Sequence, residues 1–97
     1  MSPTIGNLQA ASRQITEIAG QFGVSNIRVF GSVGRGTATE GSDVDLLVEM
    51  DPGRSLLDLI GFEQELQDHL GLDVDIVVEG GIHPMLKRTI LAEAKPL

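Results

Sequence analysis

Two aspartates separated by a single residue, Asp43 and Asp45, are the side chains of this sequence best suited to chemistry. They begin a run with β-strand character, in which alternate side chains leave the same face. Two carboxylates held this close repel each other unless a cation lies between them. Magnesium is the expected cation because it prefers oxygen ligands and often takes substrate phosphates as further ligands. The pair therefore predicts metal-dependent phosphoryl transfer, in which two ions about 3.5–4 Å apart stabilise the attacking and leaving oxygens.

A glycine-serine turn precedes the aspartates. Gly31 and Ser32 follow a short β-branched and aromatic run, residues 27–30, that is typical of a strand. A glycine here lets the backbone approach a phosphate closely, and the next amide groups and the Ser32 hydroxyl can donate hydrogen bonds to it. Arg35 lies on the same side if the turn is helical, and its guanidinium matches two phosphate oxygens. We predict that Gly31, Ser32 and Arg35 bind the triphosphate of a nucleotide.

The elements that position these residues follow from the hydrophobic pattern. We expect a helix over residues 5–22, strands over residues 27–30, 43–49 and 73–78, a short helix in the glycine-rich loop 31–41, a helix from Ser55 to Gly71, and a last helix starting at Pro84. The expected core stripes of the long helices are Leu8, Ala11, Ile15, Ile18 and Phe22; Leu56, Leu59, Phe62, Leu66 and Leu70; and Leu86, Ile90, Leu91 and Ala94. This order predicts an α/β (α+β) fold, a small mixed β-sheet with helices packed on it, in one domain over residues 1–97.

The composition limits the classes of partner. Fourteen acidic and seven scattered basic residues give a formal net charge of −7, so we expect no nucleic acid partner. The sequence has no cysteine, which favours the reducing cytoplasm. No apolar run approaches membrane-spanning length, and the first residues lack the pattern of a secretory signal. We expect a cytoplasmic protein without a membrane partner.

The order of these motifs resembles a known signature. Gly31-Ser32-Val33-Gly34-Arg35-Gly36, followed by Ser42-Asp43-Val44-Asp45-Leu46, is similar to the signature of the DNA polymerase β-like nucleotidyltransferase superfamily, and most of all to that of its minimal nucleotidyltransferase (MNT) antitoxin family. The similarity extends through Val74-Asp75-Ile76-Val77 and covers essentially the whole chain. It implies the polymerase β-like fold and a catalytic triad in which Asp43 and Asp45 bind both metals and Asp75 holds the metal that activates the attacking hydroxyl. Asp73 remains an alternative to Asp75.

The resemblance also implies an activity and a partner. MNT-like antitoxins pair with HEPN-domain ribonuclease toxins, and some transfer AMP from ATP to a toxin tyrosine. By resemblance this chain is a protein adenylyltransferase that uses ATP and two Mg²⁺ ions. It contains no tyrosine, so a tyrosine acceptor must come from another chain. Two alternatives stay open: an antitoxin that neutralises its toxin by binding alone, and a transferase that modifies a small molecule such as an antibiotic.

Several features have plainer interpretations. A Gly-Ser turn or an Asp-x-Asp pair is common in ordinary turns when it occurs alone, and only their combination favours a nucleotide site. His69 and His83 have no convincing metal partner in the sequence, and we assign them no role. The leucine stripes are expected to form core rather than partner-binding surface, and Lys87 and Arg88 are expected to be solvated.

Overall fold

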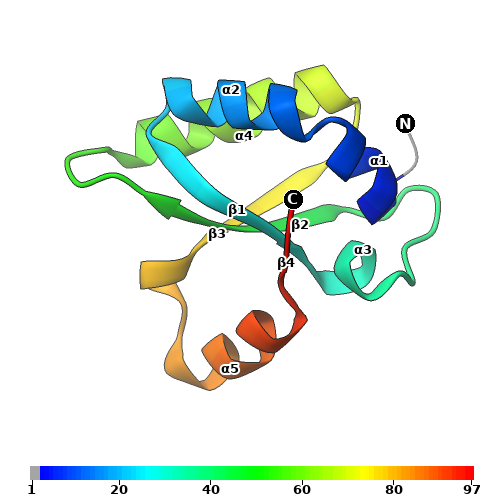
Figure 1. Ribbon diagram of the computed structural model, residues 1–97. Coiled ribbons are helices and arrows are strands. Elements are labelled where there is room, and N and C mark those ends of the chain that lie inside the picture. Colours follow the sequence, from blue (N-terminus) through cyan, green and yellow to red (C-terminus); the bar gives the residue numbers. More distant parts are fainter. Residues whose placement is uncertain (1–2) are drawn as a thin grey trace.

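The computed structural model describes residues 3–97, which form a four-stranded sheet in the order β3-β2-β1-β4 with helices on both faces (Figure 1). The helices are α1 (Ile5–Ala10), α2 (Ser12–Gln21), α3 (Gly31–Arg35), α4 (Leu56–Leu70), the 3-10 turn η1 (Glu79–Gly81) and α5 (Pro84–Glu93). The strands are β1 (Val24–Phe30), β2 (Val44–Met50), β3 (Val74–Val78) and β4 (Lys95–Pro96). The predicted fold class, a small mixed sheet covered by helices, is confirmed.

The pairing of the strands explains the mixed sheet. β1 runs antiparallel to β2 and to β4, whereas β2 and β3 are parallel. A parallel pair needs a long crossover connection, and α4 supplies it between β2 and β3. The parallel register places Val44 beside Val74 and Asp45 beside Asp75. This crossover therefore sets which acidic residues of the two strands become neighbours.

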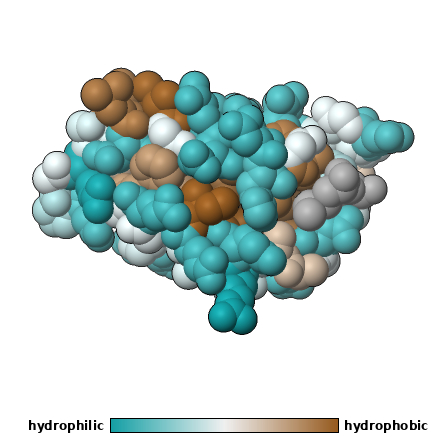
Figure 2. All heavy atoms as spheres, turned by 90° about the horizontal axis from the view of Figure 1, so that it is seen from above, coloured by the Kyte–Doolittle hydropathy of each residue, from teal (hydrophilic) through white to brown (hydrophobic). Residues whose placement is uncertain are grey.

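The main core lies between the sheet and the layer of α1, α2 and α4 (Figure 1). Its fully buried members are apolar side chains from both layers: Leu8, Ile15, Val29, Val33, Val44, Leu46, Val48, Phe62, Leu66 and Val74. The Phe22 ring packs on the Phe62 ring at a centroid distance of 6.5 Å. The outer surface of this layer is mainly hydrophilic, with a hydrophobic patch at the end of the molecule where α4 begins and smaller hydrophobic areas elsewhere (Figure 2).

The opposite face of the sheet is covered by α5 and η1, with α3 at the end of β1 (Figure 1). Asp45, Leu47 and Glu49 alternate with the core residues of β2, so they point toward this second face. Leu47 is nonetheless fully buried, because β2 contacts η1 there. The acidic residues of interest therefore share a face with α5.

The helix boundaries agree with the local signals in most places. The Asp58 carboxylate accepts a hydrogen bond from the Ser55 amide at 2.9 Å at the start of α4, and the left-handed Gly71 ends it. Pro84 is the first residue of α5, as predicted. The single helix predicted over residues 5–22 is wrong, because Ala11 leaves the helical conformation and separates α1 from α2. The two short elements η1 and β4 were not predicted.

Strand boundaries and two core stripes also differ from the predictions. β1 begins at Val24, while Asp43 and Asp73 each lie just before a strand rather than within it. Leu56 is 69% exposed and Leu86 and Leu91 are 59% and 39% exposed, so their assignment to the core is wrong. Helical spacing identifies an apolar stripe but does not say whether a neighbouring element covers it.

The helices are short relative to a lipid bilayer. The longest, α4, has 15 residues and spans about 22 Å, against about 30 Å for the hydrocarbon layer. Within residues 3–97 no helix is both long and apolar enough to cross a membrane.

Candidate active site

Asp45 and Asp75 form the centre of the site. They are register partners on the parallel strands β2 and β3, whose axes in such a pair lie about 4.8 Å apart. Residues paired in this way project to the same side of the sheet, here the side of α5. Asp43 precedes β2 by one residue and is exposed. The structure thus brings Asp45 and Asp75 together and keeps Asp43 at the start of the same strand.

The electrostatics of Asp45 reflect this crowding. Partial burial raises the pKa of its carboxyl group above the ordinary value of 3.8, and the negative charges of Asp75 and then Asp43 raise it further. The positive charge of Arg35 acts in the opposite direction. These three carboxylates repel one another and have only one cation nearby, so an added cation would reduce the repulsion.

Gly31 shapes the wall beside Asp45. Its φ of +68° lies in the left-handed region that glycine adopts readily, and a Cβ atom built there would collide with the Asp45 Oδ2 atom. The Asp45 carboxylate therefore lies against the bare backbone at the junction of β1 and α3. This contact explains the glycine at position 31 independently of the turn, because any side chain there would displace the Asp45 carboxylate.

The predicted phosphate-binding residues all belong to α3. Gly31 and Ser32 are its first two residues and Arg35 its last, so the short helix predicted in the glycine-rich loop is present. Ser32 is partly exposed, while the Arg35 guanidinium donates a hydrogen bond to the Glu93 carboxylate at 3.1 Å. Arg35 thus lies near the end of α5 and near Asp45, where its positive charge partly offsets the rise in the pKa of Asp45.

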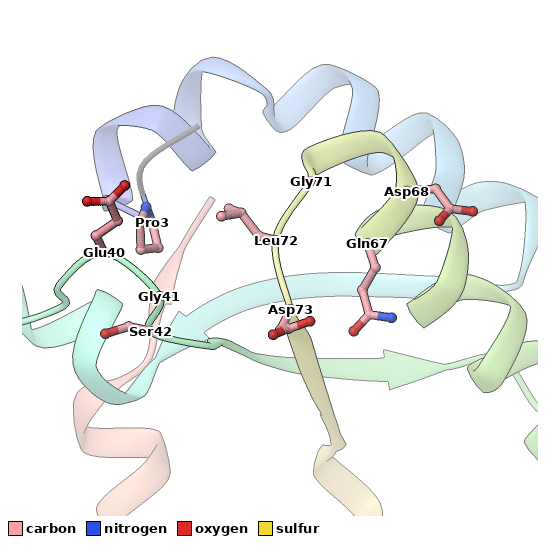
Figure 3. Close-up of a pocket in the computed structure, with 9 residues that line it drawn as sticks. All are labelled: Pro3, Glu40, Gly41, Ser42, Gln67, Asp68, Gly71, Leu72 and Asp73. Atoms are coloured by element: carbon pink, nitrogen blue, oxygen red, sulfur yellow. The ribbon is translucent and has the colours of Figure 1, made fainter.

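Asp73, the alternative to Asp75, faces a different space. It is exposed and lines a cavity of about 610 Å³ with residues of the 40–42 loop and the end of α4 (Figure 3). Glu40 and Asp68 are the other charged residues of that lining, which contains no basic side chain. An anionic triphosphate is disfavoured there by like charge. The geometry therefore favours Asp75, the register partner of Asp45, over Asp73 as the third candidate residue.

The donor set suits a hard cation, although it does not form a closed cage. Within residues 3–97 no three acidic, histidine or cysteine side chains are arranged so that together they could hold a metal ion. Magnesium sites commonly use only one or two carboxylates, with water and substrate phosphate oxygens as the other ligands. The carboxylates of Asp43, Asp45 and Asp75 are the described groups that could hold such ions.

Sequence reasoning missed one residue of the site. Glu93 pairs with Arg35 from 58 positions away, and its backbone carbonyl also lies close to Gly34. No local motif identifies Glu93, because in the sequence it is one polar residue at the end of an amphipathic helix. The histidines stay outside the site: the His83 Nδ1 atom accepts a hydrogen bond from the Met85 amide at the start of α5, and His69 lies in the last turn of α4.

Comparison with known proteins shows the family to which the sequence belongs. The model of the nucleotidyltransferase domain family matches residues 12–97. A Methanocaldococcus jannaschii protein to which protein adenylyltransferase activity has been attributed is 43% identical over 88 residues, covering 91% of this chain and 95% of the relative. The protein adenylyltransferase MntA of Thermococcus cleftensis is 44% identical over 77 residues, covering 79% of this chain and 78% of the relative.

Solved structures give the same result. A protein described as a minimal nucleotidyltransferase is 42% identical, with a TM-score of 0.85, and the alignment covers 97% of this chain and 96% of that one. A chain of a toxin-antitoxin structure with AMP-PNP shares the fold, with a TM-score of 0.74 at 23% identity, and the alignment covers 87% of this chain and 69% of that one. The predicted resemblance to minimal nucleotidyltransferases is confirmed. The chain therefore belongs to the nucleotidyltransferase family and is a small enzyme of that family.

Proposed function

We propose that this protein transfers AMP from ATP to a tyrosine hydroxyl of a partner HEPN-domain toxin, with the help of two Mg²⁺ ions. The observation that carries the proposal is the register of Asp45 and Asp75 beside the side-chain-free Gly31. Two neighbouring carboxylates next to an open backbone can hold a cation and a phosphate within one small volume.

Asp43, Asp45 and Asp75 are the residues that would hold magnesium. When bound, the ions neutralise developing negative charge and lower the pKa of the acceptor hydroxyl. Partial burial and then the charges of Asp75 and Asp43 raise the pKa of Asp45, which supports this role, because a nearby cation would offset both effects. Asp43 and Asp45 would hold both ions, and Asp75 would help to hold the ion that activates the acceptor hydroxyl.

The triphosphate would lie along α3. The partly exposed backbone at Gly31, the Ser32 hydroxyl and the Arg35 guanidinium would supply donors and one positive charge. The acceptor oxygen would then attack the α-phosphorus. That bond forms while the bond from the α-phosphorus to the oxygen bridging to the β-phosphate breaks, so pyrophosphate leaves and the hydroxyl loses its proton to solvent.

The nature of the acceptor rests on composition and on relatives. The sequence contains no tyrosine, so a tyrosine acceptor must lie outside it, which fits a partner protein. Two relatives carry the name protein adenylyltransferase, and a structure of similar fold is a toxin-antitoxin assembly with AMP-PNP. We identify the toxin as a HEPN protein from the resemblance to MNT antitoxins.

The test is transfer of label from ATP that carries radioactive phosphorus at the α position. Incubation with magnesium and the HEPN toxin encoded beside this protein should label the toxin and raise its mass by whole AMP units. Asp43→Asn combined with Asp45→Asn should abolish labelling, while the control Asp51→Asn, in the exposed turn after β2, should not. Equal labelling by the double variant would falsify the metal roles. An unmodified toxin that is still neutralised by the double variant would instead establish inhibition by binding alone.

A further inference from the structure

The charges of this protein are divided unevenly along the chain. Residues 81–97 carry three basic side chains and one acidic side chain, whereas residues 1–80 carry four basic and thirteen acidic ones. The arginines at positions 13, 28, 35 and 54 each form an ion pair with a carboxylate. Among residues 3–97, the cations without an ion-pair partner within 4 Å are Lys87, Arg88 and Lys95, all in or after α5. The C-terminal segment is thus a basic surface on an acidic protein.

The same helix exposes large apolar side chains. α5 has ten residues and none of them is buried. Met85 is 83% exposed, and Arg88 is an exposed residue one turn further along the same side of the helix. Leu91, 39% exposed, follows Arg88 by one turn and Lys87 by four residues, so these four side chains share the outer side of α5. Exposed apolar side chains rimmed by unpaired cations are the composition expected of a surface that meets a partner with apolar and acidic groups.

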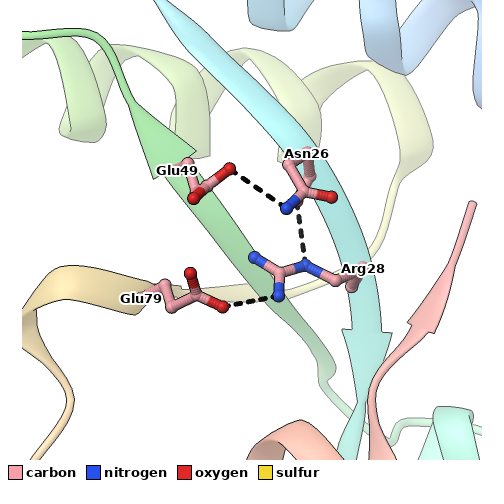
Figure 4. Close-up of polar contacts among 4 residues, drawn as sticks. All are labelled: Asn26, Arg28, Glu49 and Glu79. Atoms are coloured by element: carbon pink, nitrogen blue, oxygen red, sulfur yellow. Dashed lines mark hydrogen bonds and ion pairs between the residues drawn. The ribbon is translucent and has the colours of Figure 1, made fainter.

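α5 is also fixed in position relative to the active site. At its C-terminal end Glu93 accepts from Arg35 of α3. At its N-terminal side the turn η1 is tied to β1 by Arg28, which donates to Glu79 at 2.7 Å, and Glu49 and Asn26 extend this network (Figure 4). The helix thus lies on the sheet face of Asp45 and Asp75 and is anchored at both ends, so a protein bound to it would be held at a defined distance from the site.

We infer that Met85, Lys87, Arg88 and Leu91 of α5 form the docking surface for the protein acceptor, a partner whose contact surface is apolar and acidic. This inference rests on the proposed function, because it assumes that the substrate is a protein. Docking at α5 would place the acceptor hydroxyl on the α5 side of the sheet, where Asp75 lies. The body of the enzyme, with its excess of carboxylates, would at the same time repel an acidic partner from other orientations.

Two paired substitutions test the docking surface. Met85→Ser with Leu91→Ser removes the apolar contact, and Lys87→Glu with Arg88→Glu reverses the charge; all four side chains are exposed, so the fold should persist. The matched control is Leu56→Ser with Leu57→Ser, which removes two exposed leucines at the start of α4. The readout is the dissociation constant for the HEPN toxin, measured by calorimetry on the inactive Asp43→Asn, Asp45→Asn background so that no chemistry intervenes.

We expect each α5 pair to weaken toxin binding by about tenfold or more, the scale of central contacts in protein interfaces, and the α4 pair to leave it within about twofold. In the active protein the KM for toxin should rise while the KM for ATP stays constant. Unchanged toxin binding by both α5 pairs, or equal weakening by the α4 pair, overturns the inference. Loss of a self-associated dimer in the α5 variants, seen by sedimentation of the protein alone, would assign α5 to self-association and also overturn it.

The outcome is separable from that of the proposed function. If the active protein binds the toxin through α5 but transfers no AMP, the transferase proposal fails and the docking surface stands. If it transfers AMP with equal efficiency in the α5 variants, the docking inference fails and the transferase proposal stands.

Discussion

Asp45 and Asp75 lie directly opposite each other on two neighbouring parallel strands, although they are thirty positions apart in the sequence. The register of the sheet therefore makes Asp75 the neighbour of Asp45, and Asp73 does not share that partnership. Replacing each by asparagine distinguishes them. We expect Asp75→Asn to lower kcat roughly a hundredfold, since metal charge stabilisation contributes several kcal/mol, and Asp73→Asn to change it by less than about threefold. Steady-state transfer of labelled AMP is the measurement, and the reverse order of effects would identify Asp73 as the third ligand.

Asp45 should also control a pH dependence of stability. Because its pKa is raised in the folded protein, the folded state binds this proton more readily than the unfolded state. The free energy of unfolding should therefore decrease as the pH rises from about 3.8 through the raised pKa, when no divalent cation is present. Asp45→Asn should remove that decrease. Urea titrations of both proteins at several pH values measure it.

The comparison of the two proteins isolates Asp45 from other carboxyl groups. The hydrogen bond from the Ser55 amide lowers the pKa of Asp58, and the hydrogen bond from Arg28 lowers the pKa of Glu79, so both contribute stability above the unfolded pKa that is lost as the pH falls. Their contribution is common to wild type and variant. Parallel curves for the two proteins would mean that Asp45 does not carry the predicted effect.

Magnesium should stabilise the wild-type protein. A cation that binds only the folded state adds RT ln(1 + [L]/Kd), or about 2.7 kcal/mol at a hundredfold excess over Kd. We expect the melting temperature to rise with MgCl2 in wild type and in Asp51→Asn, and to stay constant in Asp45→Asn. Sodium chloride at matched ionic strength controls for screening. A magnesium response that survives in Asp45→Asn would place the cation elsewhere.

Gly31→Ala should harm activity more than its effect on stability explains. The alanine Cβ atom would collide with the Asp45 carboxylate and would sit at a left-handed φ, which costs a non-glycine residue roughly 1–2 kcal/mol. Gly36→Ala is the matched control, because Gly36 has a similar φ of +77° but no atom within 4 Å of the added Cβ. We expect similar backbone strain in both, but a loss of kcat of more than tenfold in Gly31→Ala alone. Equal kcat values for the two variants would show that the contact of Gly31 with Asp45 does not matter for activity.

The pair Arg35–Glu93 predicts a competition for the nucleotide-binding arginine. Glu93 accepts from the Arg35 guanidinium at 3.1 Å, so it competes with phosphate oxygens for the same donors. Exposed ion pairs contribute up to about 1 kcal/mol, so Glu93→Gln should lower the KM for ATP by up to roughly fivefold. Arg35→Gln should raise it. A higher KM in Glu93→Gln would show instead that Glu93 positions Arg35 for binding.

Much of the chemistry was predictable because it depends on neighbours in the chain. The one-residue spacing of Asp43 and Asp45, the bend at Gly31-Ser32 and the termination of α4 at Gly71 are local properties, set by backbone conformations and side-chain alternation over a few residues. The Asp-x-Asp spacing and the glycine-rich loop therefore indicated phosphate and metal chemistry, and the order of helices and strands indicated the fold class, before any long-range contact was known.

Long-range packing decided the rest. Asp45 and Asp75 are neighbours because of the register between the parallel strands β2 and β3, which α4 connects. Arg35 contacts Glu93 because of the position at which α5 is anchored. Apolar spacing in α5 predicted a buried stripe, but the sheet and η1 leave Leu86 exposed. The physical reason is that periodicity defines the face of an element, whereas burial and proximity depend on what other elements cover that face.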